Sequence, residues 1–281
     1  MKVSGFTFCR NAVRYDYPVV ESIRSILPIV DEFVVNVGRC DDGTLDLVRS
    51  IENPKIRIVE SVWDDALRKG GLIYSQQTNI ALSRCTGDWA FYLQADEVVH
   101  EDDLPKIVDA TRAHITNQKV RGLLFRYLHF VGDYRSTNPW FYHKAVRIIR
   151  NNGEIESCGD AVGFHLKATG QYLQSGPCEW LATSGARIFH YGWVKDPRTM
   201  AAKKQEQTKV YHGDTPLPEE ARLCESGSSV FSDYPILKEF RGSHPCVMRT
   251  RVQSARRLAP RRSRWLTPAF YRAVLVRGFR G

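Results

Sequence analysis

The chain has 281 residues, of which 43% are apolar and 11% aromatic, enough to bury the core of one large domain or two smaller ones. It contains no run of about 18 apolar residues and begins without the pattern of a secretion signal, so we expect a cytoplasmic protein with no membrane-spanning helix. The net charge of +9 belongs to the end of the chain, because residues 241–281 hold eleven arginines and no acid, whereas the rest carries 29 basic and 31 acidic side chains. This balanced body predicts no nucleic-acid partner, and seven scattered cysteines predict reduced thiols.

Short apolar strands alternate with single amphipathic helices through the first 94 residues. Strands are predicted at 3–8, 32–38, 55–61 and 88–94, and the helices between them begin at Pro18, at Thr44 and near residue 72. Buried strands separated by single helices predict an α/β fold with a Rossmann-like, mostly parallel sheet that is covered on both faces.

The ends of three predicted strands are polar, at residues 9–11, 36–38 and 94–97. Ligands of open parallel sheets bind beyond the carboxyl ends of the strands. We therefore expect these three segments to meet at one crevice.

The second half of the chain is less regular. Strands are predicted at 121–130, 143–151 and 186–194, with a glycine-rich polar piece before the last of them, which indicates a mixed extension of the sheet with long loops. A polar stretch at 212–233 then separates this body from the arginine-rich tail.

Two adjacent carboxylates, Asp96 and Glu97, follow the fourth strand. Carboxylates beside an amide form a hard-oxygen site that suits Mg²⁺ or Mn²⁺ completed by the phosphates of a ligand. The alternative is an acidic helix start, in which the residues from 97 to 103 favour the amino terminus of the following helix through its dipole. Asp96 lies directly at the strand end, so we assign it to the site and leave the later acids to the helix start.

The segments "RNA", "NVGRCDDGT", "SQQTNIALSRCTGDWAFYLQADE", "GDAVGF" and "HYGW" together resemble the family 2 glycosyltransferases of GT-A fold. The subgroup in which glutamine replaces the first aspartate of the D-x-D motif is the most similar. The resemblance implies a nucleotide-sugar-binding half at 1–98, an acceptor-binding half at 99–211 and a linker with a basic, helical C-terminal extension at 212–281. It also implies inverting transfer of a sugar from a nucleotide diphosphate sugar, with a UDP-sugar expected, to a glycan, lipid-linked or peptide acceptor.

Carried onto this sequence, the resemblance makes Asp96 a ligand of the metal that bridges the two donor phosphates. Gln94 matches the first aspartate of the motif, which contacts the ribose or the base, and an amide can still hydrogen-bond a hydroxyl there. The other implied donor contacts are Arg10, Asn11, Asn36, Gly38, Asn79 and Ala95.

His190 is the implied second metal ligand, and an imidazole ligand suits Mn²⁺ better than Mg²⁺. The alternative is a core histidine packed between Phe189 and Tyr191. An inverting transfer also needs a base, for which Asp160 is the candidate and Glu156 the reserve. A turn-capping role beside Gly159 is the alternative for Asp160.

The arginine-rich tail has two interpretations that the sequence leaves open. It suits a helix that rests on the anionic cytoplasmic face of a membrane, and it equally suits a helical arm that packs its apolar stripe on the body. Two other functions also stay open. A sugar-phosphate nucleotidyltransferase typically has a glycine-rich basic loop after the first strand, which "FCRNAVRYDYP" lacks, and a non-catalytic module would bind a nucleotide or an anionic surface.

Overall fold

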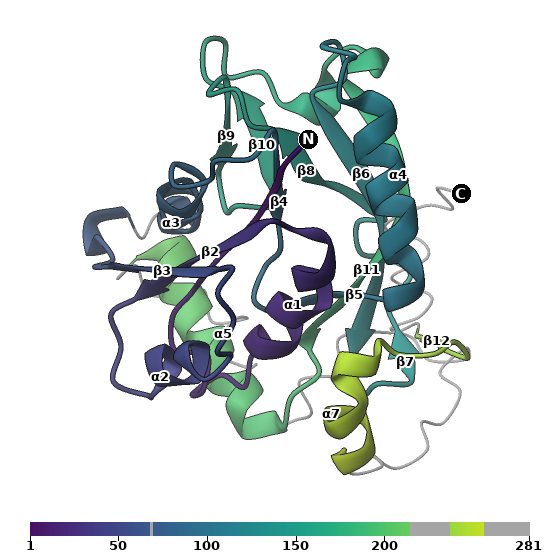
Figure 1. The fold of residues 1–281 in the computed structure, drawn as a ribbon. Helices are drawn as coiled ribbons and strands as arrows, with labels where there is room; N and C mark the ends of the chain where they lie inside the picture. The colour runs from purple at the N-terminus through teal and green to yellow at the C-terminus, as the bar shows by residue number, and fades with distance from the viewer. Residues whose placement is uncertain (68–69, 214–236, 256–281) are drawn as a thin grey trace, which may run out of the picture.

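The computed structural model describes residues 1–67, 70–213 and 237–255, which form an α/β fold around one mixed sheet (Figure 1). The main path of the sheet has the spatial order β12 (Lys238–Glu239), β7 (Ser136–Thr137), β6 (Gly122–Val131), β8 (Lys144–Arg150), β4 (Trp89–Tyr92), β1 (Val3–Cys9), β2 (Glu32–Gly38) and β3 (Ile56–Ser61). Off this path, β11 (Leu181–Trp193) pairs with β6 and β5 (Glu97–Val99) pairs with β11.

The pairing divides the sheet into a parallel part and a mixed part. β1 lies parallel to both β2 and β4, and β3 lies parallel to β2. β8 is antiparallel to β4 and β6, whereas β11 is parallel to β6 and antiparallel to β5. The predicted mostly parallel half and its mixed extension are therefore confirmed.

Both faces of β1, β2 and β4 are buried, and alternate side chains of these strands point to opposite faces. Phe33 and Phe91 pack in one cluster with residues of α1 (Val19–Ile26), α2 (Thr44–Arg49) and α4 (Leu104–His114). Phe6 and Val34 pack in a second cluster with residues of α3 (Leu72–Leu82), β9 (Ile155–Cys158) and β10 (Gly163–Leu166). This two-sided burial explains why the strands read as continuous apolar runs.

One long helix was not expected from the sequence. α5 (Pro197–His212) begins after Asp196, whose side chain accepts hydrogen bonds from the backbone N–H groups of Arg198 and Thr199. Pro197 at the first helical position completes a standard helix start. α5 supplies side chains to the candidate site described below.

Part of the C-terminal region packs on the body of the fold. α7 (Arg249–Ser254) follows Met248, which is buried in a cluster with Phe130 and Phe189. Arg251 donates hydrogen bonds to Asp16 at 2.6 Å and to Glu21 at 2.7 Å. The predicted helical tail from residue 256 onward, and most of the polar stretch before it, lie outside the described residues.

Short 3₁₀ turns complete the secondary structure at Leu27–Ile29, Asp65–Leu67, Glu101–Asp103, Leu173–Ser175, Cys178–Trp180 and Cys246–Met248. Across the described ranges, every helix is too short or too polar to cross a membrane.

Candidate active site

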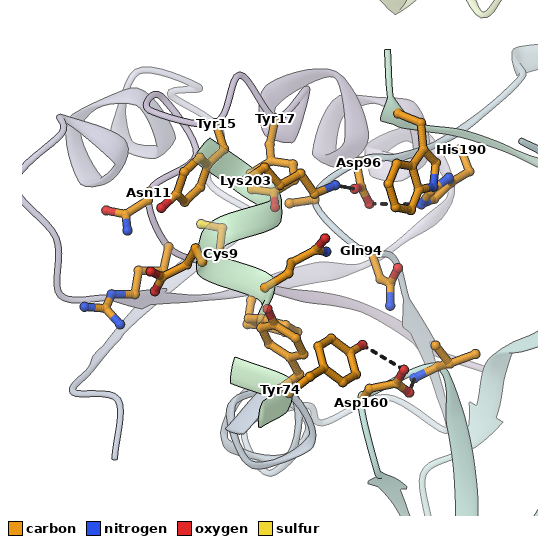
Figure 2. A pocket seen from close by; sticks show the side chains of 18 of the residues that line it. Cys9, Asn11, Tyr15, Tyr17, Tyr74, Gln94, Asp96, Asp160, His190 and Lys203 are labelled. Atoms are coloured by element: carbon orange, nitrogen blue, oxygen red, sulfur yellow. Dashed lines mark hydrogen bonds and ion pairs between the residues drawn. The ribbon is translucent and has the colours of Figure 1, made fainter. Parts of the chain in front are cut away.

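A cavity of about 310 Å³ lies where β1 and β4 end. Its lining comes from the end of β1 and the segments that follow β1 and β4, from the loop between β9 and β10, from β6 and β11, and from α5. Further aromatic side chains of the lining belong to Trp63, Tyr74, Phe141 and Tyr142. Figure 2 shows the central side chains, with Asp96 and His190 at one side of the group, Asp160 at another and Gln94 between them. Two of the three strand ends that the sequence predicted to meet, at residues 9–11 and 94–97, therefore line the cavity.

Seven of the predicted site residues line this cavity, namely Arg10, Asn11, Gln94, Ala95, Asp96, Asp160 and His190. Four others do not. Asn36 donates its amide hydrogens to the backbone and side-chain oxygens of Gln77, both at 2.9 Å, and Gly38 lies directly under the indole of Trp63. The end of β2 is thus covered by neighbouring side chains.

Asn79 and Glu156 also have partners away from the cavity. The Asn79 side chain bonds both backbone groups of Ser157, at 2.9 Å and 2.8 Å, and so ties α3 to β9. Oε1 of Glu156 lies at hydrogen-bond distance, 3.0 Å, from Nε2 of His165. Their proposed roles in donor binding and base catalysis stay predictions.

Asp96 is buried and its two oxygens face different partners. Oδ1 lies 3.6 Å from Nε2 of His190, and Oδ2 accepts a hydrogen bond from Nζ of Lys203 at 3.3 Å. Burial alone would raise the pKa of this carboxyl group, but the nearby positive charges of Lys203 and Lys195 and the hydrogen bond from Lys203 outweigh burial and lower the pKa. Asp96 is therefore an anion at neutral pH.

A chain of hydrogen bonds sets the proton positions on the two buried histidines. Nε2 of His129 lies 2.8 Å from the carbonyl oxygen of Tyr142, which can only accept, so this nitrogen carries the proton. Burial lowers the pKa of His129 to about 3, so the ring is neutral and its Nδ1 has a free lone pair. Nδ1 of His190, 3.3 Å away, must then be the donor in the pair.

Burial also lowers the pKa of His190, so this ring is neutral with its single proton on Nδ1. Its Nε2 lone pair then faces the Asp96 carboxylate across 3.6 Å. Two electron-rich atoms that face each other in this way suit a shared cation, and the hydrogen bond on the far nitrogen is the usual support of a ligating histidine. The residues therefore fit a divalent metal ion, with one oxygen and one nitrogen ligand from the protein.

Glu97, the second acid of the sequence pair, points away from the cavity. It is fully buried and receives two parallel hydrogen bonds from Arg147, both of 2.8 Å, and a third of 2.8 Å from the hydroxyl of Tyr127. Bidentate pairs of this kind are the strong, directional form of a salt bridge. We call this group, Glu97, Arg147 and Tyr127, the buried clamp.

The buried clamp touches both loops that carry the candidate carboxylates. Glu97 accepts a hydrogen bond from the backbone N–H of Gln94 at 3.1 Å, which fixes the turn before Asp96. Arg147 donates to the carbonyl oxygen of Val162 at 3.0 Å, in the loop of Asp160. One buried ion pair therefore joins the two sides of the cavity.

Asp160 lies in a tight loop in which Gly159 and Ala161 both have positive φ, 57° and 63°. Its Oδ1 accepts from the N–H of Val162 at 3.3 Å, and its Oδ2 accepts from the hydroxyl of Tyr211 at 2.9 Å. The loop-capping bond of the alternative interpretation is therefore present, together with a second bond at the cavity.

Sequence reasoning missed the contribution of α5. This helix brings Lys203 to Asp96, as Figure 2 shows, and it also brings Tyr211 to Asp160. The pair Asp196-Pro197 was a signal for the helix start. Nothing in the local sequence signals that Lys203 is buried, because the helix is polar and a lysine normally lies at the surface.

The sequence matches no family model and no curated protein sequence. The structure is similar to that of S. aureus TarS, with 13% identity over 79% of this chain and a TM-score of 0.46. A shorter form of TarS in complex with UDP-GlcNAc gives 14% identity over 79% of this chain and a TM-score of 0.43. Glucosyl-3-phosphoglycerate synthase from Mycobacterium tuberculosis, in complex with Mn²⁺, UDP and phosphoglyceric acid, gives 17% identity over 45% of this chain and a TM-score of 0.32. The chain spans 41% of the TarS chain, 69% of its shorter form and 42% of the synthase.

Proposed function

We propose that this chain is a metal-dependent, inverting glycosyltransferase that moves a sugar from a nucleoside diphosphate sugar to an acceptor hydroxyl. The observation that carries the proposal is the pairing of Asp96 with the bare Nε2 of His190 in a cavity that also contains Asp160. The motif resemblance of the sequence supports the same function.

Asp96 and His190 would hold the cation, and a ligand set that includes imidazole favours Mn²⁺ over Mg²⁺. When bound, such a cation neutralises the negative charge that develops on a diphosphate leaving group. Around it, Arg10, Asn11 and Gln94 line the cavity with a guanidinium and two amides that can hydrogen-bond phosphate, ribose or base.

Asp160 would take the proton of the acceptor hydroxyl as the oxygen attacks the sugar. Attack on the face opposite the diphosphate needs a base on the other side of the sugar from the cation. Asp160 and Asp96 belong to different loops of the same cavity, which supports this division of roles (Figure 2). Asp160 is released for this step when the acceptor replaces the hydroxyl of Tyr211.

The acceptor class is a glycan, a lipid-linked sugar or a peptide, and a UDP-sugar is the donor to test first. A membrane acceptor would agree with a tail that rests on an anionic membrane face in the cytoplasm, since the eleven arginines of residues 241–281 attract such a surface.

The test is release of UDP from a panel of UDP-sugars by the full chain, with Mn²⁺, with Mg²⁺ and with EDTA. We expect release with a divalent ion, more with Mn²⁺ than with Mg²⁺, and none with EDTA. NMR of the early product should show the inverted anomer. Release that is equal with and without EDTA would contradict the metal dependence, and neither binding nor release with any nucleotide sugar would contradict the function.

A further inference from the structure

Lys203 is a buried cation at the position where the candidate metal ligands meet. Only 3% of the residue is exposed. Its ammonium donates to Oδ2 of Asp96 at 3.3 Å and to the carbonyl oxygen of Gly192 at 2.9 Å. The faces of the Tyr17 and Trp193 rings, 4.9 Å and 5.4 Å away, complete its surroundings.

The surroundings hold this ammonium close to Asp96. A side chain at position 192 would collide with the Asp96 carboxylate and lie 2.8 Å from the His190 ring, so the chain approaches both groups as closely as glycine allows. Lys203 belongs to α5, in which Met200 and Val210 are the other buried residues. The position of the Lys203 amino group beside Asp96 is therefore fixed by packing.

The charges of the protein groups at the candidate metal position nearly cancel. Asp96 contributes one negative charge, Lys203 one positive charge and the neutral His190 ring none, and the positive charge of Lys195 also acts on Asp96. A divalent cation that arrives alone therefore meets one carboxylate and one nearby ammonium that repels it. A nucleoside diphosphate brings the negative charge that the protein lacks.

We propose that Lys203 makes metal binding conditional on the donor, so that the divalent ion binds tightly only together with a nucleoside diphosphate. The inference rests on the proposed function and specifies which residue couples the two ligands. In the free chain Lys203 neutralises Asp96, and in the loaded site the phosphates offset the charges of Lys203 and the ion together. Lys203 thus determines the order and the strength of ligand binding.

The test is a titration of the full chain with Mn²⁺, carried out with and without UDP. The EPR signal of the free ion measures how much Mn²⁺ stays unbound at each step. Wild type is expected to bind Mn²⁺ at least about tenfold more tightly when UDP is present. Lys203→Met removes the ammonium and keeps an unbranched side chain of similar length. It should bind Mn²⁺ alone at least about tenfold more tightly than wild type, because the repelling charge is gone.

The coupling can be measured from either ligand. Because coupling between two ligands is reciprocal, Lys203→Met should reduce by the same factor the effect of Mn²⁺ on UDP affinity and the effect of UDP on Mn²⁺ affinity. Lys203→Arg keeps the charge and is expected to retain the wild-type coupling. If Lys203→Met unfolds, Lys203→Gln serves the same comparison.

Lys209→Met is the matched control, because Lys209 lies on the same helix with an exposed side chain. It should leave both affinities unchanged. The inference is overturned if Lys203→Met binds Mn²⁺ alone with wild-type affinity while wild type still binds UDP and Mn²⁺ together. If wild type binds no UDP in the presence of Mn²⁺, the proposed function itself is wrong, and this outcome is distinct from the first.

Discussion

Asp160 divides its two oxygens between the loop and the cavity, one toward the N–H of Val162 and one toward the hydroxyl of Tyr211. Asp160 can therefore cap its loop and also act as a base in the cavity. The bond to Val162 shapes the loop, and the bond to Tyr211 faces the space that an acceptor would enter. A neutral amide could keep the first role but could not accept a proton.

We therefore expect Asp160→Asn to keep UDP affinity within about twofold of wild type and to lower turnover by about 10² to 10⁴-fold, the usual contribution of a general base. Tyr211→Phe should change turnover far less, because it removes only a partner that the acceptor replaces. Calorimetry with UDP and a UDP-release assay measure the two quantities separately. Turnover of Asp160→Asn within a factor of a few of wild type would show that another group takes the proton.

At the scale of elements, the buried clamp joins β5, β6 and β8 behind the cavity. Arg147 and Glu97 are both completely inaccessible to solvent, and each bond between them is 2.8 Å long. A buried ion pair is weak evidence for stability, because desolvation of two charges offsets most of their attraction. Its links to Gln94 and Val162 suggest a different use, which is to fix the separation of the loops that carry Asp96 and Asp160.

We expect Arg147→Lys, which keeps the charge but loses the two-pronged geometry, to lower turnover at least about tenfold while the chain stays folded. Most of the effect should fall on kcat, because in the proposed mechanism groups on one side of the cavity would bind UDP whereas the chemical step would need both sides. Steady-state kinetics well below the unfolding temperature measure this split. A loss of stability with kcat unchanged would reduce the clamp to a structural role.

Glu32 offers a control for Arg147→Lys, because it is a buried, hydrogen-bonded carboxylate far from the cavity, at the amino end of β2. It is a buried carboxylate that accepts from Ser4, from Thr86 and from Arg57, at 2.6 Å, 2.7 Å and 2.9 Å respectively. Burial opposes its ionisation, yet these hydrogen bonds lower its pKa from 4.5 to about 2. Glu32→Gln should therefore destabilise the fold without a selective loss of kcat.

The sign of the pH dependence identifies the Glu32 contribution. The folded pKa lies below the unfolded one, so the unfolded chain binds more protons between pH 2 and 4.5. The contribution, on the order of 3 kcal/mol, is complete above pH 4.5 and disappears as the pH falls toward 2. Urea unfolding should show that the free energy of unfolding falls less in Glu32→Gln than in wild type as the pH is lowered from 4.5 to 2.

For the whole molecule, sequence patterns predicted the parallel half of the fold because its signals are local. β1, β2 and β4 are apolar runs buried on both faces, and each falls within about two residues of its predicted bounds. Pro18 and Gly43 mark the starts of α1 and α2, as the sequence indicated. The helix that was predicted to begin near residue 72 corresponds to α3.

The elements that were missed depend on contacts between distant residues. β5 has only three residues and exists through its pairing with β11, which itself begins at Leu181, five residues before the predicted start. The β9–β10 hairpin was expected to be loop, because its polar and glycine residues carry no clear alternation. α5 has few apolar residues, so its inward face cannot be recognised from periodicity.

The same distinction holds for the candidate site. Asp96 and Asn11 follow from the rule that strand ends meet at one crevice, and they line the cavity. The end of β2 breaks the expectation, because Gln77 and Trp63 from other segments cover Asn36 and Gly38. Lys203 and Tyr211 were missed, since only tertiary packing places them beside the two carboxylates.

The C-terminal region is tied to the cavity as well as to the sheet. Arg251 pairs with Asp16, whose carbonyl oxygen accepts from Nζ of Lys195 at 2.8 Å. Tyr17, the residue after Asp16, lines the cavity and faces Lys203. Residues near the end of the chain therefore support the loop that surrounds the buried ammonium.

The measurement that tests the central claim most directly is the affinity of the full chain for UDP, by calorimetry, with and without Mn²⁺. We predict that Mn²⁺ strengthens UDP binding at least about tenfold in wild type and by less than about twofold in Asp96→Ala, which removes the proposed oxygen ligand. Equal UDP affinity with and without Mn²⁺ in wild type, or an undiminished Mn²⁺ effect in Asp96→Ala, would contradict the account.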